Sequence, residues 1–109
     1  MMLIEINRKF WEVHKLPSTD PLLYYDNNYT RGATWHRKHI IALSEELNIY
    51  TAPTVIAHEL THAFIFSTQM DIPETFTEEQ ICNFVADYGQ QILDLTKSVY
   101  ETLYLRATD

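Results

Sequence analysis

The spacing of hydrophobic residues predicts a helix at the N-terminal end of the chain. Four apolar residues recur there every three or four positions: Leu3, Ile6, Phe10 and Val13. This spacing places them on one face of a helix over residues 3–16. Pro17 ends the predicted helix, because a residue that precedes proline is pushed out of the helical conformation.

A second periodic run predicts a long C-terminal helix. Its start is marked by Thr77 and Gln80, which fit a capping box, where each side chain accepts a hydrogen bond from the other residue's backbone N–H. The apolar positions that follow keep a 4-3-4-3-4 spacing: Ile81, Val85, Tyr88, Ile92, Leu95 and Val99. We expect this seam to pack against the N-terminal helix.

The middle of the chain predicts a small sheet and a third helix. Residues 33–44 form the best strand region, because they include a short apolar run. A helix is expected from about Thr54 to Ser67 or Gln69, ahead of Pro73. Together these elements predict an α+β fold with an N-terminal helix, a small antiparallel sheet of two or three strands, a middle helix and a long C-terminal helix.

Composition and charge narrow the class of protein. A length of 109 residues suits a single domain over residues 1–109, and 46% hydrophobic with 21% charged residues is typical of a globular chain. Fifteen Asp and Glu against eight Lys and Arg give a net charge of −7, which disfavours direct binding to nucleic acid or anionic membranes. No apolar run is long enough for a membrane span. The single cysteine suits a reducing, cytoplasmic compartment.

The candidate chemistry lies in the middle helix. The run His58-Glu59-Leu60-Thr61-His62 is an H-E-x-x-H motif. Residues four apart share one face of a helix, so both imidazoles can bind one metal ion. Neutral imidazole is a good ligand for Zn²⁺, and a neighbouring carboxylate can take a proton from an activated water. The motif therefore predicts zinc held by His58 and His62, with Glu59 as the general base.

Apolar residues surround this motif on nearly all sides, so the helix is expected to be largely buried. Two buried histidines and a buried glutamate need a compensating partner, which a metal would supply. In the alternative interpretation, the two histidines lie on a solvated helix face and Glu59 forms an ordinary surface ion pair.

A catalytic zinc site usually has three protein ligands. Four acidic residues downstream of the motif are candidates for the third: Asp71, Glu74, Glu78 and Glu79. Helical phase favours Glu79, which shares a face with Asn83 and the small Ala86. Asn83 could accept the free ring N–H of a ligating histidine. Glu78 is turned by about 100° from Glu79 and suits the helix dipole instead.

The motif and the segment that follows it resemble the gluzincin class of zinc metallopeptidases. In that class the third ligand is a glutamate on the next helix, in a pattern like Glu79-Gln-Ile-Cys-Asn83. Over residues 32–93 the chain is similar to short ImmA/IrrE-like peptidases of bacteria and to small H-E-L-T-H-A proteins of phages and prophages. The resemblance implies Zn²⁺ bound by His58, His62 and Glu79, Glu59 as general base, Asn83 orienting a ligand, and a bacterial or phage-infected cytoplasm.

The expected function is hydrolysis of a protein or peptide substrate, aligned by the exposed strand edge near residues 36–43. Larger members of the class carry a further domain with an oxyanion-stabilising tyrosine or histidine, which a chain of this length lacks. Three residues could substitute, although packing or surface roles are the simpler interpretation for each: His36, His39 and Tyr88. An aromatic cluster could line a substrate groove, although packing is again the simpler use: Tyr24, Tyr25, Tyr29 and Trp35. Cys82 is interpreted as a small packing residue.

Two other classes of function stay open on the sequence. One is a zinc-stabilised interaction protein that does not turn over a substrate, and the other is a helical scaffold without metal. Tyr100 and Tyr104 stand at helical spacing near the C-terminus, which makes the C-terminal helix a candidate surface for a homodimer.

Overall fold

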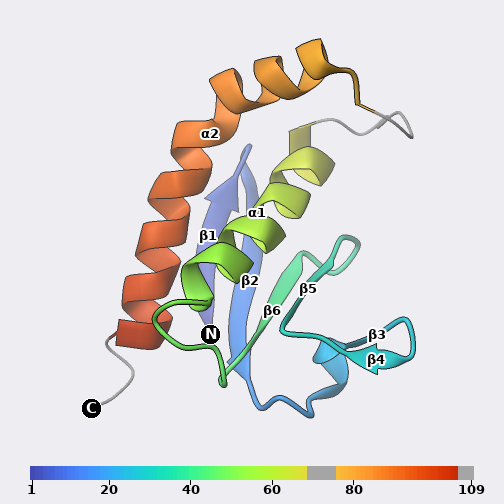
Figure 1. The fold of residues 1–109 in the computed structure, drawn as a ribbon, viewed down its shortest axis with the longest axis vertical. Helices are drawn as coiled ribbons and strands as arrows, with labels where there is room; N and C mark the ends of the chain where they lie inside the picture. The colour runs from blue at the N-terminus through green and yellow to red at the C-terminus, as the bar shows by residue number, and fades with distance from the viewer. Residues whose placement is uncertain (69–75, 106–109) are drawn as a thin grey trace.

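The computed structural model describes residues 1–68 and 76–105, and these form the expected α+β fold (Figure 1). The strands are β1 (Met2–Ile6), β2 (Lys9–Leu16), β3 (Tyr24–Tyr25), β4 (Asn28–Tyr29), β5 (Gly32–Trp35) and β6 (Ile40–Ser44). The helices are α1 (Ala52–Thr68) and α2 (Glu78–Tyr100), with a short 3-10 turn η1 (Pro21–Leu23) and a π-helical extension η2 (Glu101–Leu105). Figure 1 shows α1 lying across one face of the larger sheet and α2 running alongside it.

The N-terminal segment is a β-hairpin, so the helix predicted over residues 3–16 is wrong. Strands β1 and β2 pair antiparallel, and the two-residue turn between them, Asn7 and Arg8, has positive φ angles of 49° and 66°. Such angles build the tight turn that matches the twist of paired strands. Of the residues taken for a helical face, Leu3 and Phe10 are 58% and 63% exposed. The buried positions instead alternate along each strand: Ile4, Ile6, Trp11 and Val13.

The larger sheet has the strand order β1-β2-β6-β5, and it is mixed where an antiparallel sheet was expected. Strand β2 pairs with β6 in parallel, while β5 pairs with β6 antiparallel. The predicted strand region at residues 33–44 is therefore a hairpin of two strands. His39 ends the turn between them with a positive φ of 53°. The strand β6 lies inside the sheet, and β5 forms its edge.

The core lies between this sheet and the two helices. Its large, fully buried side chains come from both helices and from the strands β1, β2 and β6: Ile6, Trp11, Val13, Ile41, Leu43, Ile56, Leu60, Phe64 and Val99. The Trp11 indole Nε1 donates to Ser67 Oγ at 3.2 Å, which fixes the end of α1 over the N-terminal hairpin. Burying each of these large side chains contributes about 1.5–3 kcal/mol, so α1 is anchored firmly on the strands.

Helix α2 begins as expected and packs differently from the prediction. The capping box is present, because Thr77 N–H donates to Gln80 Oε1 at 2.8 Å and Gln80 N–H donates to Thr77 Oγ1 at 3.2 Å. Without an N-terminal helix to cover them, Ile81 and Val85 are 51% and 59% exposed. The seam is buried only further along the helix, and α2 contacts α1 through aromatic pairs such as Phe64 with Tyr88. None of the helices in the described ranges has the length and hydrophobicity that crossing a membrane requires.

The C-terminal extension η2 docks back on the sheet of its own chain. The Tyr104 hydroxyl donates to the carbonyl of Ser44, at the end of β6, over 2.7 Å. Burial raises the pKa of this phenol to about 12, because the charged form would lose its hydration. Tyr104 therefore has a partner within the chain, and homodimer formation through this end of the molecule stays a prediction.

Candidate metal centre

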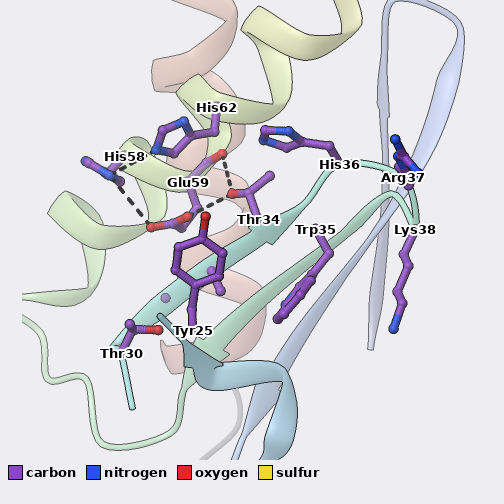
Figure 2. Close-up of a pocket in the computed structure, with 12 residues that line it drawn as sticks. Tyr25, Thr30, Thr34, Trp35, His36, Arg37, Lys38, His58, Glu59 and His62 are labelled. Carbon is purple, nitrogen blue, oxygen red and sulfur yellow. Dashed lines mark hydrogen bonds and ion pairs between the residues drawn. The ribbon is translucent and has the colours of Figure 1, made fainter. Parts of the chain in front are cut away.

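His58 and His62 come together on the outer face of α1, one helical turn apart. Their Nε2 atoms lie 3.2 Å from each other, and their ring centroids are 4.9 Å apart (Figure 2). Residues at positions i and i+4 of a helix are neighbours on its surface, so the sequence spacing alone produces this convergence. The two imidazoles therefore lie side by side, as the motif predicts.

This spacing fits a shared zinc ion. Two nitrogen ligands at the usual zinc distance and a tetrahedral angle lie about 3.3 Å apart. A hydrogen bond between one protonated and one bare ring nitrogen also satisfies a contact of 3.2 Å. The donor set and its separation are thus compatible with zinc and require no rearrangement of α1.

The two histidines are exposed. This contradicts the expectation that they are buried in a largely buried helix, and it agrees with the alternative interpretation that they lie on a solvated helix face. The His58 side chain is 68% exposed, whereas the Glu59 residue is only 7% exposed. The core-facing side of α1 is occupied by Leu60 and its apolar neighbours, which turns the histidine stripe outward. Because Glu59 is buried, it does not form the ordinary surface ion pair of the alternative interpretation.

His62 is held in the form that binds metals. Its partial burial lowers the pKa of the imidazole below the usual value, and this effect outweighs the nearby Glu59 carboxylate, which raises the pKa. His58 and His36 lower it further by charge repulsion. A lowered pKa leaves the ring neutral at pH 7, and only neutral imidazole can coordinate a metal.

Glu59 is positioned by a residue of the edge strand that the sequence analysis did not single out. The Thr34 hydroxyl lies 2.8 Å from Glu59 Oε1 and 3.1 Å from the Glu59 carbonyl, and it donates to these oxygens. The other carboxylate oxygen, Oε2, lies 4.0 Å from His58 Nε2. Thr34 therefore binds one carboxylate oxygen, and the second is next to the histidine pair.

Gly32 allows α1 to approach the edge strand closely at this point. A Cβ atom at position 32 would lie 2.8 Å from Val55 Cγ1 and 3.0 Å from Glu59 Cγ. Real Cβ atoms essentially never approach other atoms within 3.0 Å. From the sequence, Gly32 was not expected to contact the site, although a glycine in a strand often marks a close approach of another backbone.

We expect Gly32→Ala to push Glu59 out of place. The mutation should lower stability by about 1–3 kcal/mol through overpacking and reduce any Glu59-dependent activity by about tenfold or more. Gly89→Ala is the matched control, because its Cβ would meet only the exposed Val85 side chain at 3.3 Å. It should stabilise α2 by about 0.5–1 kcal/mol. Equal effects of the two mutations in thermal melts would contradict the close approach at Gly32.

The histidine pair and Glu59 open into a pocket of about 670 Å³ between α1 and the edge strand (Figure 2). This volume lies in the range of small-molecule and peptide sites. Tyr25 and Trp35 of the aromatic cluster line the pocket, and their use in a substrate groove stays a prediction. Figure 2 shows the Tyr25 hydroxyl directed toward Glu59. His36 also lines the pocket, with its ring centroid 6.4 Å from that of His62.

The third predicted ligand is not brought to the histidine pair. Glu79 and Asn83 are exposed on the first turns of α2, and within residues 1–68 and 76–105 no three His, Cys, Asp or Glu side chains form a metal-binding group. Glu78 is exposed on the same turn. Asp71 and Glu74, the other two candidates, lie outside the described residues. Glu79 as a ligand and Asn83 as its neighbour therefore stay predictions from the sequence.

The remaining candidates lie away from the pocket lining. His39 stacks on Trp11 with ring centroids 4.6 Å apart, and Tyr88 packs against Phe64 and Phe84. Their role is therefore packing, and of the three substitutes for an oxyanion-stabilising group only His36 lines the pocket. Cys82 is exposed, so its interpretation as a packing residue is wrong.

Comparison of the chain with protein-family models, with curated proteins and with solved structures finds no match. The family resemblance of the motif thus rests on the residues of this sequence alone.

Proposed function

We propose that this protein is a zinc-dependent metallopeptidase whose metal is held by His58 and His62. The observation that carries the proposal is the convergence of the two Nε2 atoms, 3.2 Å apart, beside the buried Glu59 carboxylate in an open pocket. A buried glutamate without a chemical role would be costly to retain, because burying a carboxylate is unfavourable. The third ligand is proposed to be Glu79, on the sequence pattern alone.

The chain's own residues divide the chemistry between them. Zinc bound at this site would supply a Lewis acid that lowers the pKa of a water to about 7 and polarises a carbonyl. Glu59 accepts a proton from the attacking water and delivers it to the leaving amine nitrogen. Thr34 keeps the carboxylate in place through its 2.8 Å hydrogen bond to Oε1, and Oε2 remains for the proton transfer.

The edge strand β5, next to the histidine pair, could bind an extended peptide as an additional strand of the sheet. The Arg31 carbonyl accepts from Ser44 N–H at 3.0 Å, so Arg31 forms a hydrogen-bonded pair across the β5–β6 ladder. In an antiparallel ladder, residues that are hydrogen-bonded to the neighbouring strand alternate with residues that are not. Gly32 and Thr34 are of the second kind, so their backbone N–H and C=O groups point away from β6, to the free edge of the sheet. The docking edge is therefore at residues 32–35, and the β6 part of the expected 36–43 edge is interior.

Metal removal tests the proposal. The full chain loaded with zinc should cleave members of a mixed peptide pool, and a chelator should abolish the cleavage until zinc is restored. Mass spectrometry of the pool identifies both the cleaved peptides and the bonds that break. Zinc-loaded protein that leaves every peptide intact would favour the interaction protein without turnover.

A further inference from the structure

One end of the pocket carries positive charge that the mechanism above does not use. Arg37 and Lys38, in the turn between β5 and β6, line the same pocket as His58 and Glu59 (Figure 2). Among the lining residues that the structure describes, Glu59 is the only one with a carboxylate. The pocket thus joins a catalytic end, next to α1, to a basic end at the β5–β6 turn.

Within residues 1–68 and 76–105, no carboxylate pairs with either cation. Both side chains are exposed. Lys38 Nζ lies 5.7 Å from the centre of the Trp35 ring, which is held in turn by a 2.8 Å hydrogen bond from its Nε1 to the Leu22 carbonyl. The chain as a whole has a net charge of −7, so these two unpaired cations make the electrostatic potential at this end of the pocket positive on an otherwise negative molecule.

The basic end lies in the path of a peptide docked on β5. Gly32 and Thr34 direct backbone groups to the free edge beside Glu59, and Arg37 follows Thr34 by three residues. An extended chain advances about 3.3 Å per residue, and β5 ends at Trp35, so the turn that carries Arg37 begins about 7 Å along the strand from Thr34. A substrate side chain two or three residues from the bond facing Glu59 would therefore meet the cations.

We propose that this pocket selects acidic peptides, with Arg37 and Lys38 each available to bind an Asp or Glu side chain two or three residues from the scissile bond. The proposal rests on the proposed peptidase function. A guanidinium and an ammonium are strong hydrogen-bond donors to a carboxylate. Figure 2 shows the Arg37 and Lys38 side chains extending in opposite directions from the turn, so each can meet a different acidic side chain of a peptide. A nucleic acid, by contrast, would extend along a molecule that is negative elsewhere.

Peptide binding tests the selection separately from cleavage. The probes are fluorescein-labelled ten-residue peptides of neutral sequence in which a Glu–Glu pair is moved along the chain, each matched by a Gln–Gln peptide. The full-length, zinc-loaded Glu59→Gln variant is used so that probes stay intact. At its best position the Glu–Glu peptide should bind about fivefold tighter than its match, and the preference should vanish in about 0.5 M salt.

Two double variants locate the effect. Arg37→Gln/Lys38→Gln should reduce the preference to about one. Arg8→Gln/Lys9→Gln removes the same two charges from the β1–β2 turn, which does not line the pocket, and should retain most of the preference. Equal binding of Glu–Glu and Gln–Gln peptides, or an equal loss in both double variants, would overturn the proposal. Tighter binding of a single-stranded oligonucleotide than of the Glu–Glu peptide would also overturn it.

The outcomes separate this inference from the peptidase proposal. Preferential binding of Glu–Glu peptides without cleavage of any probe by the wild-type protein would keep the acidic subsite and remove the peptidase. Cleavage of Glu–Glu and Gln–Gln peptides at equal rates, with equal affinities, would keep the peptidase and remove the acidic subsite.

Discussion

Glu59→Gln is expected to lower the rate of peptide cleavage by about a thousandfold while leaving zinc binding intact. The amide has nearly the shape of the carboxylate, and its oxygen can still accept the Thr34 hydrogen bond that now measures 2.8 Å. It cannot accept a proton from water, so only the chemical step should fail. The measurement is kcat for a cleaved peptide, together with the zinc content and melting temperature of the same preparation.

Thr34 variants provide the graded controls for this prediction. Thr34→Val removes the hydroxyl that lies 2.8 Å from Glu59 Oε1 and keeps the side-chain shape, so cleavage should fall about tenfold with zinc retained. Thr34→Ser keeps the hydroxyl and should stay near the wild-type rate. Undiminished cleavage by Glu59→Gln with a full complement of zinc would remove Glu59 from the mechanism.

His58→Ala and His62→Ala should each weaken zinc binding by at least about a hundredfold. Mutation of residues that only support a ligand already costs about 10- to 100-fold in metal affinity, so the loss of a ligand itself should cost more. Each mutation leaves a single imidazole where two nitrogens now lie 3.2 Å apart. His14→Ala is the matched control, since His14 pairs with Glu12 on the N-terminal hairpin, does not line the pocket, and should be silent. Competition titration against a coloured chelator measures the affinities.

The same titration resolves the third ligand. We expect Glu79→Ala to weaken zinc binding and Glu78→Ala to leave it unchanged. If zinc affinity falls only in Glu78→Ala, the helical-phase argument for Glu79 is contradicted. A loss in His36→Ala, whose ring centroid lies 6.4 Å from that of His62, would place the third ligand on the β5–β6 turn.

The helices could be predicted from the sequence, and the N-terminal hairpin could not. The capping box at Thr77 and the proline limits around α1 act within a few residues, so they can be recognised locally. The first segment carried two periodicities at once: Leu3 and Phe10 completed a helical stripe, although both are exposed in the hairpin. The alternating buried positions and the two-residue turn at Asn7 were the correct signal.

The site was predictable where it depends on neighbours along the chain and not where it depends on contacts between elements. The His58–His62 pair follows from helical spacing and was predicted. The contacts of Glu59 with Thr34 and Gly32 join residues 25 or more positions apart, and no local pattern encodes them. The exposure of the histidines also depends on which face of α1 meets the sheet. For the same reason Glu79, on another helix, stays a prediction.

Metal analysis of the wild-type protein tests the central claim most directly. The chain is purified without a metal-affinity tag, and its zinc content is measured by mass spectrometry before and after chelation. We predict about one zinc ion per chain, with a lower melting temperature once the metal is removed, because a ligand of the folded state stabilises it. A chain that holds almost no zinc, and whose melting temperature is unchanged by added zinc, would contradict the proposed metal centre.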